Sequence, residues 1–208
     1  MSVLLVDPPC GSRVWEPHSE HLGLGYLAAE LRQEGHEVEI MDAGLLRWSV
    51  RKTCREILKR KPAILGISVV QPAIKNTLFI VKLLREQGLK SHICVGGHFP
   101  TLKTEVLLEK CSLIDSVVYG EGDITFPLLV KKVLGKDNWK DIKGIGYREG
   151  ESIRINPPQP LVENLDDLPF PARDTLPIVL RWGRNAMAIT SKGCYGRCIF
   201  CGPRAFYQ

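Results

Sequence analysis

Three cysteines late in the chain have the residue type and spacing that could hold an iron–sulfur cluster. Cys194, Cys198 and Cys201 follow a C-x₃-C-x₂-C pattern. Three thiolates can each bind one iron of a cubane [4Fe–4S] cluster, which leaves the fourth iron without a protein ligand. Gly193 and Gly196 allow the backbone to wrap closely around such a centre. The pattern therefore predicts a redox cluster with one iron open to a small molecule.

A zinc site is the alternative interpretation of the same cysteines. Structural zinc takes four ligands, usually arranged in C-x₂-C pairs. No histidine or cysteine follows Cys201, so a fourth ligand would have to come from elsewhere in the chain, for example from His98. The spacing favours the iron–sulfur cluster.

The residues around the cysteines resemble a known family. Thr190–Cys194, followed by Arg197–Cys201, is similar to the first strand and cluster loop of the radical S-adenosylmethionine (SAM) superfamily. The resemblance implies that SAM chelates the open iron and is cleaved to a 5′-deoxyadenosyl radical, with Phe200 beside its adenine. A radical SAM barrel needs many more strands than follow here. We therefore expect an N-terminal portion that is inactive alone.

The preceding residues alternate between strand-like and helix-like segments. Apolar, β-branched runs predict parallel strands, and runs of helical periodicity that end at glycine predict the helices between them. The expected strands are Val3–Val6, Val38–Met41, Ile64–Val70, Ile93–Val95 and Ser116–Tyr119, and the expected helices are Leu22–Glu34, Val50–Arg60, Ile74–Gln87, Leu102–Lys110 and Ile124–Leu134. The fold class is thus α/β, with a five-stranded doubly wound parallel sheet of the flavodoxin-like order 2-1-3-4-5.

The pattern changes after this sheet. Ile142–Arg148 and Ser152–Ile155 predict a β-hairpin. The proline-rich segment Asn156–Pro177 predicts an irregular strap between domains, and Ala186–Thr190 predicts a strand leading into the cysteine loop. We divide the chain into an α/β domain at 1–140, a hairpin and strap at 141–185, and the start of a radical SAM domain at 186–208.

Ligands of open parallel sheets bind at the carboxyl ends of the strands. Two of the loops there carry paired glycines, Gly96–Thr101 and Gly120–Asp123, and both could be ordinary β-α turns. A third segment, Gly23–Ala28, formally matches the dinucleotide pattern G-x-G-x-x-A. It lies too far after the first strand for that role and within an expected helix, so nicotinamide binding is not predicted.

Taken in order, these segments resemble the cobalamin (B12)-binding domain that precedes many radical SAM barrels. The resemblance rests on Val3–Pro9, Leu22–Leu31, Gly66–Val70, Gly96–Thr101 and Gly120–Asp123, and on the strap residues Asp166–Asp174. It implies that the cofactor tail lies in a cleft beside the sheet and the corrin over the strand ends. The cofactor-binding residues it implies are Pro8, Pro9, Ser68, Val69, Gly96, Gly97, His98, Gly120 and Glu121.

One departure concerns cobalt. The B12 fold supplies a histidine to cobalt from a D-x-H-x-x-G motif after the first strand. The segment Glu16–Gly23 does not fit that motif for either His18 or His21. We therefore expect cobalamin to bind base-off, with no histidine below the metal; the same absence leaves open a B12-like domain without cobalamin.

Composition narrows the class of protein. The 208 residues are 44% hydrophobic and 25% charged, as in globular proteins, and no apolar run is long enough for a membrane helix. There is no basic-then-apolar leader, and the net charge of +5 is spread along the chain, with Lys52–Lys61 as a solvated helix face. We expect a cytoplasmic protein with no nucleic-acid or membrane partner. Cys54, Cys94 and Cys111 are expected to be small buried hydrophobes, and Cys10 to lie in a loop.

The leading hypothesis is the N-terminal part of a cobalamin-dependent radical SAM enzyme, a methyltransferase acting through methylcobalamin or a cyclase. Its partners would be a small-molecule or peptide substrate and a reductant such as flavodoxin or ferredoxin. The alternatives are a radical SAM enzyme whose B12-like domain binds no cobalamin, and a non-catalytic binding module carrying a cluster. A phospho-receiver is disfavoured because Asp7 stands alone at the first strand and the third strand ends in Ser68 without an acceptor aspartate.

Overall fold

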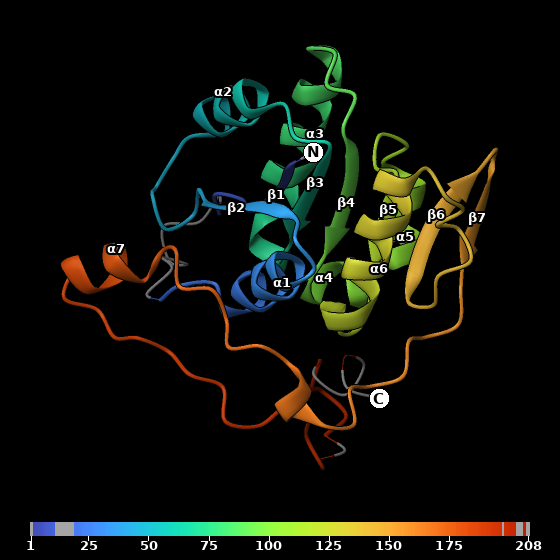
Figure 1. The fold of residues 1–208 in the computed structure, drawn as a ribbon. Coiled ribbons are helices and arrows are strands. Elements are labelled where there is room, and N and C mark those ends of the chain that lie inside the picture. The colour runs from blue at the N-terminus through green and yellow to red at the C-terminus, as the bar shows by residue number, and fades with distance from the viewer. Residues whose placement is uncertain (1, 11–18, 197, 203–205, 207–208) are drawn as a thin grey trace.

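A computed structural model describes residues 2–10, 19–196, 198–202 and 206, and its centre is one seven-stranded sheet (Figure 1). The strand order is β2-β1-β3-β4-β5-β6-β7. The first five strands are parallel, and their order is the one predicted. They are β1 (Ser2–Asp7), β2 (Glu37–Asp42), β3 (Ile64–Ser68), β4 (His92–Gly96) and β5 (Ser116–Val118).

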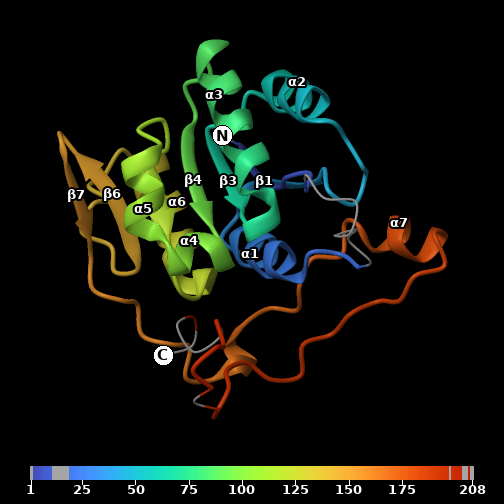
Figure 2. The same ribbon diagram turned by 180° about the vertical axis from the view of Figure 1, so that it is seen from behind.

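The helices cover both faces of this sheet, as Figures 1 and 2 show from opposite sides. They are α1 (Leu22–Gln33), α2 (Val50–Arg60), α3 (Ile74–Glu86), α4 (His98–Leu102), α5 (Thr104–Lys110) and α6 (Gly122–Gly135). Alternate residues of β1 pack into the two hydrophobic cores on opposite faces of the sheet. Val3 and Leu5 pack with α1 and α6. Leu4 and Val6 pack with α2, α3 and α5. Since successive strand residues point to opposite faces, a continuous apolar strand is what a sheet covered on both sides requires.

The predicted hairpin is part of this sheet rather than a separate element. β6 (Ile145–Glu149) pairs antiparallel with β5, and β7 (Ser152–Ile155) pairs antiparallel with β6. Ile145 is fully buried, so the hairpin contributes to the core beside α6. The hairpin extends the predicted five-stranded sheet to seven strands. Its strand β6 covers the edge of β5, which would otherwise present unpaired backbone groups. The domain boundaries at residues 140 and 185 stay predictions.

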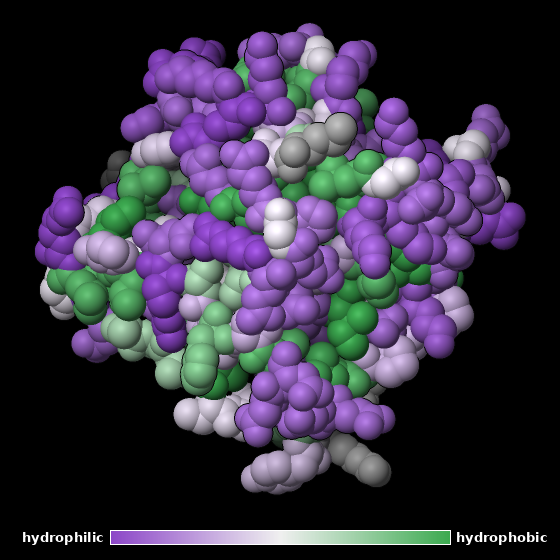
Figure 3. Space-filling model, in the orientation of Figure 1, coloured by the Kyte–Doolittle hydropathy of each residue, from purple (hydrophilic) through white to green (hydrophobic). Residues whose placement is uncertain are grey.

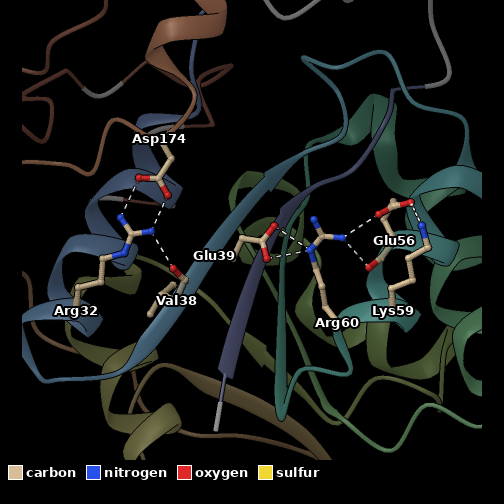
Figure 4. A network of polar contacts seen from close by, with 7 residues as sticks. All are labelled: Arg32, Val38, Glu39, Glu56, Lys59, Arg60 and Asp174. Atoms are coloured by element: carbon tan, nitrogen blue, oxygen red, sulfur yellow. Dashed lines mark hydrogen bonds and ion pairs between the residues drawn. The ribbon is translucent and has the colours of Figure 1, made fainter.

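The strap, residues 156–177, runs outside the sheet and is held against α1. Ala172 N–H donates to the carbonyl of Gly25 at 2.9 Å, and a Cβ on Gly25 would lie 2.7 Å from the Ala172 oxygen. Arg32 binds both carboxylate oxygens of Asp174 at 2.9 and 2.6 Å (Figure 4). The close backbone approach explains a glycine in the first turn of α1, since glycine is otherwise unfavourable within a helix.

Two expectations for the end of the chain were wrong. The strap was predicted to be irregular throughout, but it contains the short turn Leu165–Asp167 and the start of α7 (Leu176–Arg181). Pro177 is compatible with α7 because it lies in the first turn, where its missing N–H costs no helical hydrogen bond. Ala186–Thr190 is not a strand in this structure, because no strand of the described chain lies beside it to supply ladder hydrogen bonds.

The outer surface agrees with the expected solvated face of α2. Arg60 lies between Glu39 and Glu56, and Lys59 also pairs with Glu56 (Figure 4). Figure 3 shows that most of the visible face is hydrophilic, with apolar side chains gathered near α7. Within the described residues, no helix has the length and apolar character needed to cross a membrane.

Candidate cofactor site

A mainly apolar cavity lies at the carboxyl ends of β3, β4 and β5, between α1 and α6. Its volume is about 250 Å³. Most of its wall is apolar or glycine, as in typical small-molecule sites. The lining residues from these elements and their loops include Leu5, His21, Leu24, Leu27, Gly66, Ile67, Ser68, Cys94, Gly96, Gly97, His98, Val118, Gly120, Glu121, Asp123 and Phe126. This is the edge of the sheet at which the sequence predicted ligand binding.

Glycine is required at the centre of this edge. Gly97 has φ 97° and ψ −165°, a backbone conformation that is almost exclusive to glycine. A Cβ there would lie 3.0 Å from the Ser68 hydroxyl and 3.1 Å from the Val69 nitrogen. A Cβ on Gly96 would lie 3.3 Å from the carbonyl oxygen of Val118. The two glycines therefore let the β3, β4 and β5 loops converge and leave an open floor for a ligand.

The structure brings most of the predicted cofactor residues to this cavity. Ser68, Gly96, Gly97, His98, Gly120 and Glu121 all line it. Val69 does not, because it is fully buried in the core under α3. Pro8 and Pro9 are buried just after β1 and also lie outside the lining, and the carbonyl of Pro9 accepts a hydrogen bond from Asn76.

A histidine that sequence reasoning set aside lies in the cavity wall. His21 precedes α1, and its Nδ1 accepts a hydrogen bond from the Leu24 amide at 3.2 Å. Its Nε2 lies 2.8 Å from the hydroxyl of Ser68. Burial lowers the pKa of His21, although the nearby Asp42 opposes this. Both ring nitrogens are thus engaged within the chain. That His21 does not bind cobalt stays a prediction. His18 lies outside the described residues.

The segment that leads into the cysteine loop covers one side of the cavity. Ile189 and Lys192 line it. The ammonium of Lys192 lies 2.7 Å from the Asp123 carboxylate at the start of α6, and both side chains are largely buried. The same ammonium lies 5.3 Å from the centre of the Tyr26 ring on α1. One lysine therefore joins the approach to the cluster loop to both helices that flank the cavity. Figures 1 and 2 show this end of the chain beside the strand ends.

Inverting the charge of Lys192 should detach this segment from α6. We expect Lys192→Glu to lower the free energy of unfolding by about 1–3 kcal/mol, because it leaves a largely buried carboxylate unpaired, and to speed protease cleavage beyond the strap. Adding Asp123→Lys should restore much of the loss. The matched control is the exposed pair Lys140–Glu149, where Lys140→Glu should cost less than about 1 kcal/mol. Equal effects for both pairs, measured by urea unfolding, would contradict this docking.

The cysteine loop itself lies at the surface. Cys194 and Cys198 are exposed and Cys201 is half-buried. The Gly196 amide donates to the Cys194 sulfur at 3.3 Å, and a Cβ on Gly196 would lie 3.3 Å from that sulfur and 3.8 Å from the Cys198 sulfur. No group of three metal-binding side chains is formed in the part of the chain that the structure describes.

The loop nevertheless fits a cluster in its chemistry. The sulfurs of Cys194 and Cys198 both lie near Gly196, which has no side chain to block a cluster. The backbone amide of Gly196 donates to the Cys194 sulfur, and hydrogen bonds of this kind tune iron–sulfur clusters. Phe200, predicted beside adenine, is 89% exposed. By contrast Cys54, Cys94 and Cys111 are buried as expected, and burial raises the pKa of Cys94 to about 12. The buried thiols are poor metal ligands because the thiolate is the form that binds.

Comparison with known proteins decides the family. A sequence profile described as "B12 binding domain" matches residues 15–130, more than half of the chain. The chain belongs to the B12-binding domain family. The cavity of this B12-binding domain is lined mainly by glycine and apolar side chains, and its volume of about 250 Å³ suits a part of a cofactor rather than the whole of one. The matched residues fall within the α/β domain expected at 1–140, whose boundaries stay predictions.

Relatives of the B12-binding domain include methyltransferases. An uncharacterized methyltransferase of Pyrococcus horikoshii is 33% identical over 97% of this chain and 45% of its own length. The hopanoid C-3 methylase of Methylococcus capsulatus is 29% identical over 90% of this chain and 36% of its own. The chain thus spans less than half the length of these curated relatives.

Solved structures give the same fold. The cobalamin-dependent SAM radical enzyme OxsB, with aqua-cobalamin and SAM bound, superimposes with a TM-score of 0.85 at 27% identity, over 96% of this chain and 28% of that one. The radical SAM methyltransferase TsrM from Kitasatospora setae, at 20% identity and a TM-score of 0.78 over 42% of its length, shares the fold. Both matches run past the B12-binding domain into the segment that carries the cysteines.

Proposed function

We propose that this chain is the cofactor-binding part of a cobalamin-dependent radical SAM enzyme that acts as a methyltransferase. The observation that carries the proposal is the order of two features in one chain: a B12-binding domain with a glycine-floored cavity, followed by a C-x₃-C-x₂-C loop. When bound, cobalamin would carry the methyl group, while the cluster and SAM would supply the radical that activates the substrate. Methyl transfer is proposed because the relative that is 33% identical to this chain is named as a methyltransferase. Ring formation is the second candidate, because a relative from Synechocystis that is 29% identical over the whole chain is named as a cyclase.

The residues of the chain have distinct parts in this proposal. Ser68, Gly96 and Gly97 would hold the cofactor tail, and Glu121 lies where the corrin would pass over the strand ends. Burial raises the pKa of the Glu121 carboxyl, while the nearby Lys192 opposes that rise. Lys192 would hold the approach to the cluster loop against the same cavity. The two cofactors would therefore face each other across the ends of the strands.

The wider setting is also part of the proposal. We expect the full enzyme to take electrons from a flavodoxin or ferredoxin and to work in the cytoplasm, where unpaired thiols such as these remain reduced. All seven cysteines are free in the structure, as that compartment requires. Residues 1–208 by themselves are not expected to turn over substrate, because they span less than half the length of the curated relatives.

Cobalamin binding tests the first half of the proposal. Anaerobically purified protein is mixed with hydroxocobalamin and passed through a desalting column. We expect about one corrin retained per chain and a shifted visible spectrum that indicates base-off binding. If no corrin is retained and the spectrum does not shift, the proposal is contradicted in favour of a radical SAM protein whose B12-like domain binds no cobalamin.

Iron and sulfide analysis tests the second half. After anaerobic reconstitution we expect about four irons and four sulfides per chain, and their loss in the Cys198→Ala variant. Cys10→Ala is the matched control, since Cys10 is partly accessible but far from the loop in sequence, and it should keep the cluster. One zinc per chain with no visible absorption would contradict the cluster.

A further inference from the structure

Two polar side chains meet in a cavity that is lined mainly by glycine and apolar side chains. His21 comes from the start of α1 and Ser68 from the end of β3, and 47 positions separate them in sequence. Both line the cavity, with the Nε2 of His21 2.8 Å from the Ser68 hydroxyl oxygen. Such a pair in an apolar setting has a defined direction, because each hydrogen bond needs one donor and one acceptor.

The helix cap sets the tautomer of His21. The backbone amide of Leu24 can only donate, and it lies 3.2 Å from Nδ1. Nδ1 must therefore offer a lone pair, and the proton of the neutral ring must be on Nε2. Burial disfavours the charged ring, which is consistent with this neutral form. The Nε2–H of His21 consequently donates to the Ser68 oxygen.

The direction of the His21–Ser68 hydrogen bond determines whether the Ser68 hydroxyl can donate a hydrogen bond to a ligand. Its oxygen already accepts from His21, and Nε2 has no lone pair to take the hydroxyl proton. Among the described residues the Ser68 proton has no other recorded acceptor. The hydroxyl is thus available as a donor beside the Gly97 floor, which a Cβ would close. A flat ligand carrying one ring-nitrogen lone pair would complement this donor.

We infer that His21 is a positioning residue that fixes the Ser68 hydroxyl as a hydrogen-bond donor, so that the cavity selects corrinoids whose nucleotide base presents a free ring nitrogen. The inference rests on the proposed function, because it assumes that the cavity takes the cofactor tail. It assigns His21 no contact with cobalt. It also explains why a histidine, rather than the usual serine or aspartate, caps α1. Of these side chains, only the imidazole ring can accept from the Leu24 amide with one nitrogen and donate to Ser68 with the other.

The test distinguishes the role of His21 as the cap of α1 from its role in orienting the Ser68 hydroxyl. His21→Asn keeps a side-chain oxygen able to cap α1 but removes the ring that reaches Ser68. Ser68→Ala removes the proposed donor itself. Each variant and the double variant are titrated with cobalamin and with cobinamide, a corrinoid without the nucleotide tail, while thermal unfolding checks the fold.

The expected result is selective. His21→Asn and Ser68→Ala should each weaken cobalamin binding about 3- to 10-fold, as for loss of one hydrogen bond, and leave cobinamide affinity and the melting temperature nearly unchanged. Because His21 acts through Ser68, the double variant should bind cobalamin no more weakly than Ser68→Ala. In the free protein, ¹⁵N NMR should show the proton of His21 on Nε2.

Other outcomes overturn the inference in distinguishable ways. If the wild type retains neither corrinoid, the proposed function fails and the inference fails with it. If the wild type binds cobalamin, but the variants weaken cobinamide to the same extent, His21 is merely structural. Independent, additive losses in the double variant would likewise show that His21 does not act through Ser68.

Discussion

Gly97→Ala is expected to abolish cobalamin retention while the protein still folds. The backbone at Gly97 lies in the region of positive φ and extended ψ that side chains strongly disfavour, and strain of this kind costs about 1–3 kcal/mol. The new methyl group would also lie 3.0 Å from the Ser68 hydroxyl and 3.1 Å from a backbone nitrogen. Relief of that contact must push the β3 loop or the Gly97 loop into the cavity. We expect lost corrin in desalting and a modest fall in the urea midpoint.

Gly88 provides a matched control for this substitution. It also has a positive φ, 81°, but a Cβ there would meet nothing within 4 Å. Gly88→Ala should therefore cost about 1–2 kcal/mol of backbone strain and leave cobalamin retention unchanged. If Gly97→Ala binds the cofactor as the wild type does, or if both variants lose it together, the cofactor does not lie on the Gly97 loop.

The position of this cavity could be predicted from the sequence because it follows from the order and direction of the strands. Ser68 is the last residue of β3, Gly97 directly follows β4, and Glu121 lies in the loop after β5. Parallel strands present such positions at one edge of the sheet. The same logic shows why Val69 is different. Successive residues leaving a strand point to opposite sides, so the residue after Ser68 turns into the core under α3 rather than toward the ligand.

The residues that sequence reasoning missed are brought in by tertiary contacts. His21 reaches Ser68 across 47 positions, and Lys192 reaches Asp123 across 69. Neither contact leaves a periodic pattern in the chain. A weak local signal existed for His21, since it stands immediately before the first periodic residue of α1, where a capping side chain is expected. Histidine is not a usual cap, so that position gave no reason to look further.

The hairpin was recognised but its partner was not. Alternation and the turn at Glu149-Gly150 identified β6 and β7 as a pair of strands, yet pairing of β6 with β5 is a long-range contact. Burial of Ile145 and Tyr147 follows from that pairing. Conversely, the apolar segment Ala186–Thr190 has strand composition but lies beside no strand in the described chain. Strand propensity alone does not form a strand, because the ladder bonds need a neighbour.

A pair of carboxyl groups at the ends of β1 and β2 should make the protein less stable as the pH rises from about 4 to 7. Asp7 and Asp42 are register partners, so Asp7 is not the isolated carboxyl that the sequence suggested. Burial raises the pKa of each to about 7, and for Asp42 the charge of Asp7 adds to the rise. The Leu45 amide and His21 both lower the pKa of Asp42, but burial outweighs them.

The sign of the effect follows from these raised values. Between an unfolded pKa near 3.8 and a folded pKa near 7, the folded protein binds more protons than the unfolded chain. Stability from this pair is therefore complete below about pH 4 and is lost as the pH rises to about 7. Each extra proton bound by the folded state contributes a slope of about 1.4 kcal/mol per pH unit.

Asp42→Asn should flatten this decline. The variant removes one titrating group and also the neighbouring charge that disfavours ionisation of Asp7, while the amide oxygen can still accept from Leu45. Urea unfolding of both proteins at intervals from pH 5 to pH 8 measures the difference. Asp141→Asn is the control, because Lys132 lowers the pKa of that exposed carboxyl, and its contribution changes only in more acidic solution. Parallel curves for wild type and Asp42→Asn would show that the two carboxyl groups do not share a proton in the folded protein.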